Sequence, residues 1–191
     1  MTLNIAIIGS TKGTSSQQII DAVKCDEIDA KISFIISDKQ DSGILERAKK
    51  YDINGVFLPV NGLSRSEYDN KLNEQLKNEG IDIIILIGYM RILSDEFVKK
   101  WNKKLINIHP SLLPKFAGGI NNNVHKSVLD ANEKTTGCSV HYVSEVIDGG
   151  EIILQKSCDV LGTDNVETLK KKVQELESQA LLEVVKNWKR K

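Results

Sequence analysis

Apolar residues in the first 110 positions gather in short, nearly continuous runs, and amphipathic segments separate these runs. An unbroken apolar run of this kind is typical of a strand that is buried on both faces, as in a parallel sheet. The intervening segments carry apolar residues at helical spacing and begin with serines that are suited to cap a helix. We therefore expect strands at residues 3–9, 31–37, 55–58, 81–88 and 105–109, with a helix after each of the first four.

The rest of the chain follows a different pattern, with a pair of strands and a long final helix. Residues 136–143 alternate between apolar and polar positions, and a tight Asp-Gly-Gly turn at 148–150 precedes another strand at 151–160. Helices are expected at about 124–131 and from about 165 to the end. Together these elements predict an α/β fold in one domain, with a doubly wound, mostly parallel sheet, helices on both faces, and a late hairpin that joins in antiparallel or mixed fashion.

The run at 105–109 turns polar where it ends, and the polar residues at this end are suited to acyl chemistry. Side chains at i and i+2 of a strand share a face, so Asn107 and His109 project together, and the following proline keeps His109 extended. An asparagine amide is suited to donate to a developing oxyanion, and a histidine is suited to move a proton near neutral pH. The structural alternative is a strand that ends in a hydrogen-bonded Asn and His before a proline turn.

Other candidate residues belong to loops that we expect at the same edge of the sheet. In open α/β sheets, ligands bind outside the carboxyl ends of the strands, and the loop at 88–93 follows the most apolar strand. Asp148 lies on a later loop, from which it can approach His109. A carboxylate beside an imidazole favours the imidazolium, so such a histidine is suited to act as a general acid toward an amine leaving group. His141, within the strand at 136–143, is expected to be structural.

The segment after the first strand is small and polar, with the sequence Ser-Thr-Lys-Gly-Thr-Ser at 10–15. A strand, such a loop and a helix N-terminus make a good anion cradle, because free N–H groups and the helix dipole face the loop. The sequence is neither a Walker A motif nor the dinucleotide-binding glycine motif, which disfavours a dehydrogenase. A phosphate site and a plain turn between strand and helix both stay open.

The overall composition restricts the partners of the protein. Lys plus Arg and Asp plus Glu each number 26, so the formal charge is zero, which argues against a nucleic-acid-binding or polybasic membrane protein. The chain lacks a run long enough to span a membrane and a typical secretory leader. The three cysteines, Cys25, Cys138 and Cys158, have neither metal-ligand spacing nor the pattern of a disulfide framework. We expect a cytoplasmic protein that binds no metal.

The string Asn-x-His-Pro-Ser-Leu-Leu-Pro at 107–114, with Asp-Gly-Gly at 148–150, is highly specific and resembles the folate-dependent formyltransferase family. The similarity extends over essentially the whole chain, 1–191, and its length leaves no room for the extra domain of the longer members. It implies a Rossmann-like fold and transfer of a formyl group from 10-formyltetrahydrofolate, as co-substrate, to the amine of glycinamide ribonucleotide in purine biosynthesis. It also implies small-molecule partners and leaves a homodimer open.

The resemblance further implies roles for individual residues. Asn107 is expected to hold the oxyanion of the tetrahedral intermediate, His109 to transfer a proton, and Asp148 to sustain the charge or position of His109. The residues expected to contact the ribonucleotide come from three places. They are Gly13, Thr14 and Ser15 of the phosphate loop, Asn107 of the strand at 105–109, and Glu177 of the last helix. Residues expected to contact the folate are Arg65, Met90, Arg91, Ile92 and Leu93. On this basis residues 1–100 form the phosphate- and nucleotide-binding half, and residues 101–191 the folate-binding and catalytic half.

Three features depart from the usual pattern of the family. Thr11 stands where the phosphate loop usually has a glycine, and Ser15 where it usually has an asparagine, although a serine still donates to phosphate. Ser178 replaces a histidine that often follows the acidic residue of the last helix. The segment 118–123 is a few residues longer than in the commonest form, so no site residue is assigned there or to His125.

Two other functions stay open, the first of them because of the altered phosphate loop. One is a formyl-transferring or deformylating enzyme of the same core with another acceptor. The other is a non-catalytic nucleotide-binding module that kept the fold, since fold alone does not establish function.

Overall fold

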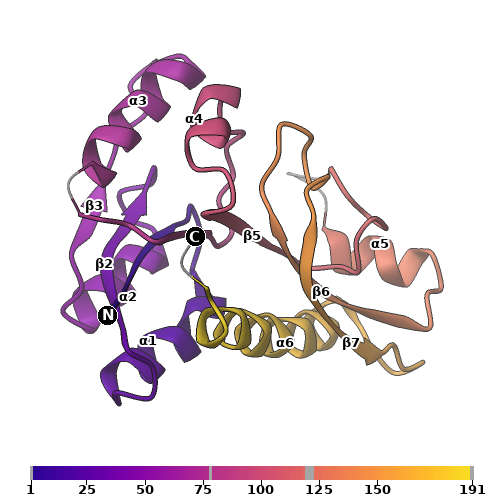
Figure 1. The fold of residues 1–191 in the computed structure, drawn as a ribbon. Helices are drawn as coiled ribbons and strands as arrows, with labels where there is room; N and C mark the ends of the chain where they lie inside the picture. Colours follow the sequence, from indigo (N-terminus) through magenta and orange to yellow (C-terminus); the bar gives the residue numbers. More distant parts are fainter. Residues whose placement is uncertain (1, 78, 119–122, 190–191) are drawn as a thin grey trace.

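A computed structural model describes residues 2–77, 79–118 and 123–189, and within these residues seven strands form one sheet. Across the sheet the strands follow the order β3-β2-β1-β4-β5-β6-β7, with helices on both sides (Figure 1). In chain order they are β1 (Leu3–Ile8), β2 (Ala30–Ser37), β3 (Gly55–Phe57), β4 (Ile83–Leu86), β5 (Leu105–His109), β6 (Thr135–Tyr142) and β7 (Ile152–Asp159). Every strand predicted from the sequence is present, and the predicted and observed ends lie close together.

The strand directions confirm the predicted topology. β1 pairs in parallel with β2 and β4, β2 with β3, and β4 with β5. β6 is antiparallel to β5, and β7 is antiparallel to β6. Parallel neighbours need a crossover connection, and the helices between β1 and β5 lie in these connections. The sheet is therefore doubly wound and mostly parallel, with β4 at its centre.

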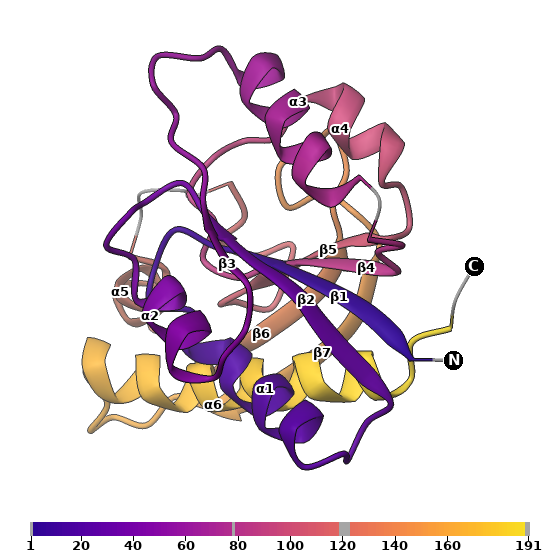
Figure 2. The same cartoon turned by 90° about the vertical axis from the view of Figure 1, so that its left-hand side faces the viewer.

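Helices cover both faces of this sheet, as Figure 2 shows in a view turned by 90°. On one face α1 (Gln17–Lys24), α2 (Gly43–Lys50) and α6 (Val166–Lys186) bury their apolar stripes against the sheet. On the other face α3 (Arg65–Leu76) and α4 (Asp95–Lys100) form a second core. The two cores arise because successive side chains of a strand point to opposite faces, so continuous apolar runs such as β4 feed both.

Two short helices complete the described structure. η1 (Thr14–Ser16) follows β1 and leads directly into α1. α5 (Val124–Asp130) packs against α6 through an apolar cluster that includes Val128 and Leu169, and it corresponds to the helix predicted at 124–131. Of the glycine- and asparagine-rich segment before α5, residues 119–122 lie outside the described residues.

Polar side chains fix where several helices begin. A capping box fixes the start of α3, because the Ser64 hydroxyl accepts from the Glu67 N–H and the Glu67 carboxylate accepts from the Ser64 N–H. Ser94 caps α4 in the predicted way. Asn165 caps α6, which ends at Lys186 and is thus slightly shorter than predicted.

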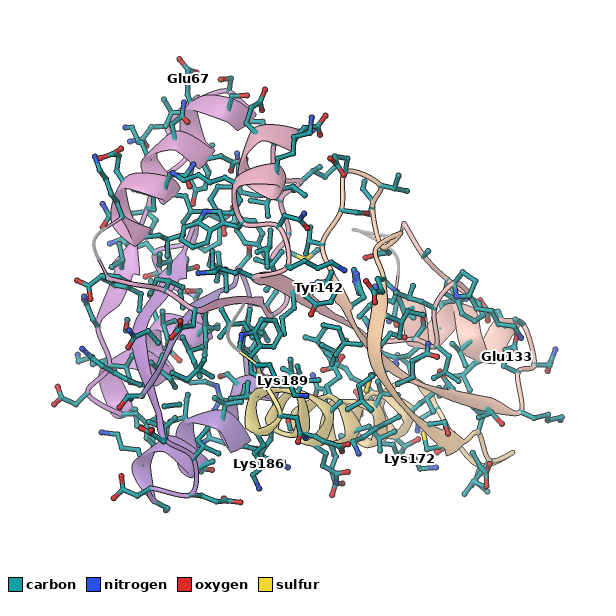
Figure 3. The ribbon with its side chains drawn as sticks, in the orientation of Figure 1. Glu67, Glu133, Tyr142, Lys172, Lys186 and Lys189 are labelled. Atoms are coloured by element: carbon teal, nitrogen blue, oxygen red, sulfur yellow. The ribbon has the colours of Figure 1, made fainter. Side chains whose placement is uncertain are left out.

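The long helix α6 separates a charged outer side from an apolar inner side. Figure 3 shows Lys172 and Lys186 projecting from α6 away from the sheet, and Tyr142 on the side of the sheet. The Tyr142 ring lies 6.2 Å, between centroids, from the ring of Trp188. Because α6 also lies against η1 and β6, it brings residues from the far end of the sequence next to the loop after β1. Among the described residues, no helix is long and apolar enough to cross a membrane.

Candidate active site

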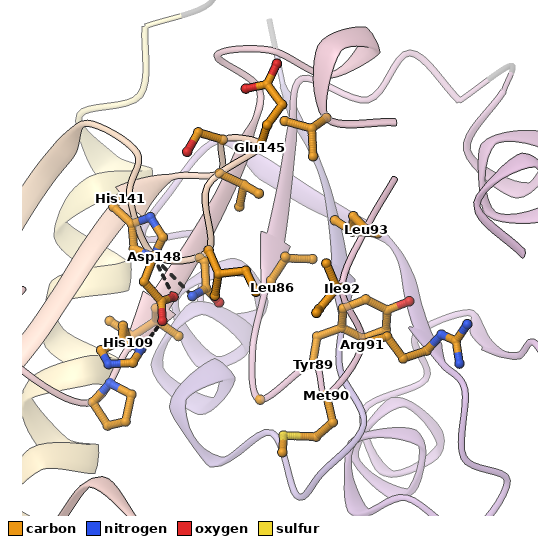
Figure 4. Close-up of a pocket in the computed structure, with 18 of the residues that line it drawn as sticks. Leu86, Tyr89, Met90, Arg91, Ile92, Leu93, His109, His141, Glu145 and Asp148 are labelled. Carbon is orange, nitrogen blue, oxygen red and sulfur yellow. Dashed lines mark hydrogen bonds and ion pairs between the residues drawn. The ribbon is translucent and has the colours of Figure 1, made fainter. Parts of the chain in front are cut away.

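A cavity of about 320 Å³ lies at the carboxyl ends of β4 and β5, where an open α/β sheet is expected to bind its ligand. Its walls come from the loop after β4, the end of β5, and the segment between β6 and β7 (Figure 4). The predicted site residues in its lining are Asn107, His109, Asp148, Met90, Arg91, Ile92 and Leu93. The structure thus brings together all three predicted catalytic residues and four of the five predicted folate contacts.

His109 and Asp148 face each other inside this cavity. Asp148 Oδ2 lies 3.5 Å from His109 Nδ1, and both side chains are almost fully buried. The other ring nitrogen, Nε2, lies 3.2 Å from the carbonyl oxygen of Phe116. Both ring nitrogens therefore face an oxygen atom that can accept a hydrogen bond. The backbone N–H of Gly118 donates to the same oxygen, Asp148 Oδ2, at 2.9 Å and so helps to hold the carboxylate in place.

The Asp-Gly-Gly sequence explains how Asp148 reaches that position. Asp148 itself has a φ of 54°, in the left-handed region that short polar residues tolerate better than most. Gly150 passes so close to β6 that a Cβ there would lie 1.7 Å from the carbonyl oxygen of Tyr142. A side chain at position 150 would push the turn away from the sheet and carry Asp148 away from His109.

Asn107 has a direct partner in His141, which lies opposite it in the antiparallel pairing of β5 and β6. His141 Nδ1 donates to the carbonyl of Tyr142 at 2.9 Å, so the neutral ring has its lone pair on Nε2. That nitrogen accepts from Asn107 Nδ2 at 3.1 Å. Burial lowers the pKa of His141, with smaller opposing effects of the Tyr142 carbonyl and of Asp148, so the ring is neutral at neutral pH.

The structure refines the expectation that His141 is structural, because this residue also lines the cavity and accepts from Asn107. Its neutral ring turns the NH₂ group of Asn107 into the site, and one N–H of that group stays available for a ligand. His141 Nε2 also lies 3.7 Å from Asp148 Oδ1. Sequence reasoning missed this residue because the register between β5 and β6 is set by tertiary pairing. The alternation of residues 136–143 indicated a strand, but not which residue of β5 would face His141.

The two arginines among the predicted folate contacts do not point their side chains into the cavity. Arg91 belongs to the lining of the cavity, but its guanidinium lies 4.4 Å from the centre of the Tyr68 ring, and Figure 4 shows it pointing away from His109 and Asp148. Arg65 is the first residue of α3 and does not line the cavity. Met90 and Ile92 are 41% and 37% exposed, which leaves apolar surface at the rim.

The predicted phosphate loop forms a separate feature beside this cavity. Gly13 has a φ of 60°, and a Cβ there would lie 2.5 Å from Ile44, so the turn requires glycine. The first N–H groups of η1 have no partner within the helix. The Ser15 hydroxyl donates to Glu177 Oε2, and burial raises the pKa of Glu177 to about 7. Glu177 therefore lies at the predicted phosphate loop and outside the lining of the cavity at the ends of β4 and β5.

Two hydrogen bonds join the phosphate loop to the loop after β4. The Ser10 N–H donates to the carbonyl of Gly88 at 3.1 Å, and the Ser10 hydroxyl accepts from the Met90 N–H at 3.0 Å. Gly88 has a φ of 57°, and a Cβ there would lie 2.3 Å from the Thr11 hydroxyl. The loop after β1 is thus joined directly to Gly88 and Met90, which line the cavity at the ends of β4 and β5. Within the described residues, no cluster of three or more His, Cys, Asp or Glu side chains is suited to hold a metal ion.

Comparisons with known proteins extend over nearly the whole chain. A phosphoribosylglycinamide formyltransferase of Haemophilus influenzae is 39% identical over 183 residues, which are 95% of this chain and 85% of that protein. A trifunctional purine biosynthetic protein adenosine-3 of Bos taurus is 42% identical over 170 residues, which are 88% of this chain and 16% of that protein.

The structural comparison agrees with the comparison of sequences. A crystal structure of glycinamide ribonucleotide transformylase 1 from Symbiobacterium toebii matches with a TM-score of 0.91 and 32% identity, over 97% of this chain and 86% of that chain. The family model described as formyl transferase matches residues 3–185, which include both loops and every predicted site residue. The chain therefore belongs to the formyl transferase family.

Proposed function

We propose that the protein transfers a formyl group from 10-formyltetrahydrofolate to the amine of phosphoribosylglycinamide, a step of purine biosynthesis. The observation that carries this proposal is the convergence of Asn107, His109 and Asp148 in one cavity at the carboxyl edge of the sheet. The relatives named as phosphoribosylglycinamide formyltransferase and glycinamide ribonucleotide transformylase support the choice of acceptor.

The reaction needs an oxyanion donor and a proton carrier. The neutral amine of the ribonucleotide attacks the formyl carbon, the bond from that carbon to the folate nitrogen breaks, that nitrogen gains a proton, and the amine loses one. Asn107 donates its remaining N–H to the oxyanion of the tetrahedral intermediate, and the neutral ring of His141 holds the amide in that orientation. One such donor contributes about 3 kcal/mol to the stabilisation of a transition state.

His109 is the proton carrier in this scheme. Asp148 faces its Nδ1, so the protonated ring is paired with a carboxylate inside a buried site. His109 gives a proton to the departing folate nitrogen, and a proton from the attacking amine restores it. A positioned acid of this kind accelerates a reaction by about 10²- to 10⁴-fold.

We assign the phosphate to Gly13, Thr14 and Ser15, and Glu177 contacts this loop through Ser15. We assign the folate to the cavity at the ends of β4 and β5. Its apolar walls and the backbone of the loop at 88–93 suit a flat heterocycle. For Arg91 we propose a backbone contact, because its side chain is stacked on Tyr68. Arg65 would reach only the outer part of a bound folate.

We keep the division of the chain at about residue 100 for the phosphate and the catalytic groups, but not for the folate. We propose that residues 1–100 hold the phosphate and residues 101–191 carry the catalytic groups, whereas the folate is held by both. Small molecules are the proposed partners, without nucleic acid or membrane, in the cytoplasm. Analytical ultracentrifugation over a range of protein concentrations would test whether the protein forms a homodimer.

A labelled substrate tests the proposal directly. The protein is mixed with 10-formyltetrahydrofolate that carries ¹³C in the formyl group and with the ribonucleotide, and the products are analysed by mass spectrometry. We expect the ribonucleotide to gain the labelled formyl group. Label that appears only as free formate would indicate a deformylase. Label that stays on the folate, with folded protein, would favour another acceptor or a binding module.

A further inference from the structure

Glu177 of α6 is a buried carboxyl group that takes no part in the chemical steps proposed above. The residue is only 8% exposed, and its Oε2 accepts the hydroxyl hydrogen bond of Ser15, which is itself buried within η1. A carboxylate this deeply buried is costly unless it is paired or protonated. Burial is accordingly the largest effect on the pKa of Glu177, and the opposing effects of Ser15 and Lys170 are smaller.

The titratable groups of α6 and of three elements packed against it, β6, β7 and α5, offer Glu177 little compensating charge. Lys170, on the same helix, lies seven residues away, which is about two helical turns. Cys138 of β6 lies close enough to Glu177 for the two groups to interact. The Cys138 thiol is neutral, since burial raises the pKa of this thiol to about 12. Lys156 of β7 acts on Cys138 but pairs with Glu183 at 2.7 Å. His125 of α5 is also influenced by Lys170, and burial lowers the pKa of His125 to about 4, so it too is neutral near pH 7.

We infer that Glu177 binds a proton when the phosphate of the ribonucleotide enters the loop at residues 13–15, and that Ser15 then turns its O–H from Glu177 to the phosphate. In the complex the protonated Glu177 donates to Ser15 Oγ, and Ser15 donates to a phosphate oxygen. One proton is taken from the solvent for each ligand bound. The inference rests on the proposed phosphate site and adds a protonation step to it.

Two properties of the Ser15–Glu177 pair lead to proton binding by Glu177. A serine has a single O–H, so Ser15 can donate either to Glu177 or to a phosphate oxygen. A phosphate dianion that is separated from an ionised carboxylate by one serine side chain is repelled, because the protein interior screens charges weakly. Protonation of Glu177 removes this repulsion and supplies the hydrogen bond that Ser15 accepts. The asparagine usual at position 15 in the family has two N–H groups, so the single donor is a consequence of Ser15.

Calorimetric titration with glycinamide ribonucleotide at pH 8 measures this proton directly. The observed heat is plotted against the ionisation enthalpy of several buffers, and the slope gives the number of protons bound. With a pKa of about 7, free Glu177 is about nine-tenths ionised at pH 8, so the wild type should take up about 0.9 proton more than Glu177→Gln. Protons exchanged by the ligand itself are common to both proteins and cancel in this difference.

Glu175→Gln is the matched control, because it removes an exposed carboxylate from the same helix. It should take up as many protons as the wild type. Equal proton uptake by the wild type and Glu177→Gln, with ribonucleotide bound to both, would overturn the inference while leaving the proposed function intact. Failure of the wild type to bind ribonucleotide in any buffer would instead overturn the proposed function.

Sulfate provides a second test that does not depend on the behaviour of the variant. It is a dianion that does not titrate between pH 6 and pH 8, so any pH dependence of its binding comes from the protein. We expect the wild type to bind sulfate about tenfold more weakly at pH 8 than at pH 6, as Glu177 loses the proton that binding requires. Affinity that is equal at the two pH values, or higher at pH 8, would overturn the inference.

Discussion

A buried titratable side chain lies beside a polar residue at the end of β5 and again at the loop after β1, and burial has opposite effects on the pKa values of the two. Opposite Asn107 of β5, burial lowers the pKa of His141 of β6, so the ring is neutral and serves as a fixed acceptor for Asn107. At the loop, burial raises the pKa of Glu177 to about 7, so its charge can change under ordinary conditions. Burial thus keeps His141 neutral as a fixed support for Asn107, whereas it lets Glu177 gain or lose a proton near neutral pH.

The two regions also differ in how they relate to the family pattern. The string at 107–114 is complete, and the structure brings its Asn107 and His109 into one cavity with Asp148. The phosphate loop has changed at Thr11 and Ser15, and both changes have structural partners: Thr11 lies against Gly88, and Ser15 binds Glu177. We therefore expect substitutions at β5 to act on the chemical step, and substitutions at the loop to act on binding and on pH dependence.

The largest effects are expected at the cavity. His109→Ala removes the proton carrier and should lower kcat/KM by about 10²- to 10⁴-fold, and Asn107→Ala removes the oxyanion donor and should lower kcat by about 10²- to 10³-fold. Steady-state assays measure both, and circular dichroism serves as the control for folding. Turnover close to that of the wild type in either folded variant would mean that the assigned role is wrong.

The next largest effect is expected for Glu177 and concerns stability. Its pKa is raised from 4.5 to about 7 in the folded protein, so its contribution to stability is present below pH 4.5 and is lost as the pH rises through about 7. The loss amounts to about 3 kcal/mol of unfolding free energy, and Glu177→Gln should not show it. Urea unfolding at pH 5 and pH 8 measures the difference between the two proteins. A difference that is the same at both pH values would argue against an elevated pKa.

A smaller effect is expected for His141, which supports Asn107 without touching the reacting atoms. His141→Phe removes the acceptor of the Asn107 amide, at a cost of about 1–2 kcal/mol, and should lower kcat by about 5- to 30-fold with little change in KM. His141→Gln keeps an acceptor and should recover part of the rate. Since His141 is neutral, the pH profile of kcat should keep its shape in both variants. A displaced profile would indicate that His141 itself exchanges the proton.

The smallest effect is expected where the two regions meet. Ser10→Ala removes the acceptor of the Met90 N–H but keeps the backbone bond to Gly88, so the loop after β4 should be held less firmly. The loss of one hydrogen bond, about 1 kcal/mol, corresponds to an increase of about fivefold in KM for the folate. Ser10→Thr keeps the hydroxyl and is the control. An equal change in both variants would show that the hydroxyl is not responsible.

Much of this molecule could be predicted from local patterns in the sequence. Continuous apolar runs identified the parallel strands, alternation identified β6, and serines identified the starts of helices such as α3, because each signal depends on residues that are close in sequence. The shared face of Asn107 and His109 follows from strand geometry alone. These features required no knowledge of how distant segments meet.

The remaining features depend on contacts between distant segments. The register that sets His141 opposite Asn107 is a property of the β5–β6 pair. The stacking of Arg91 on Tyr68 turns its side chain away from the cavity, and no spacing in the sequence indicates this. Likewise, the bond between Ser15 and Glu177 joins residues 162 positions apart. Each of these contacts changes what a side chain can do, although the type of residue stays the same.

Release of tetrahydrofolate from 10-formyltetrahydrofolate, measured with and without phosphoribosylglycinamide, tests the central claim most directly. The proposed arrangement of Asn107, His109 and Asp148 predicts release only when the ribonucleotide is present, and loss of that release in Asn107→Ala. Equal release without the ribonucleotide would contradict the claim and identify a hydrolase.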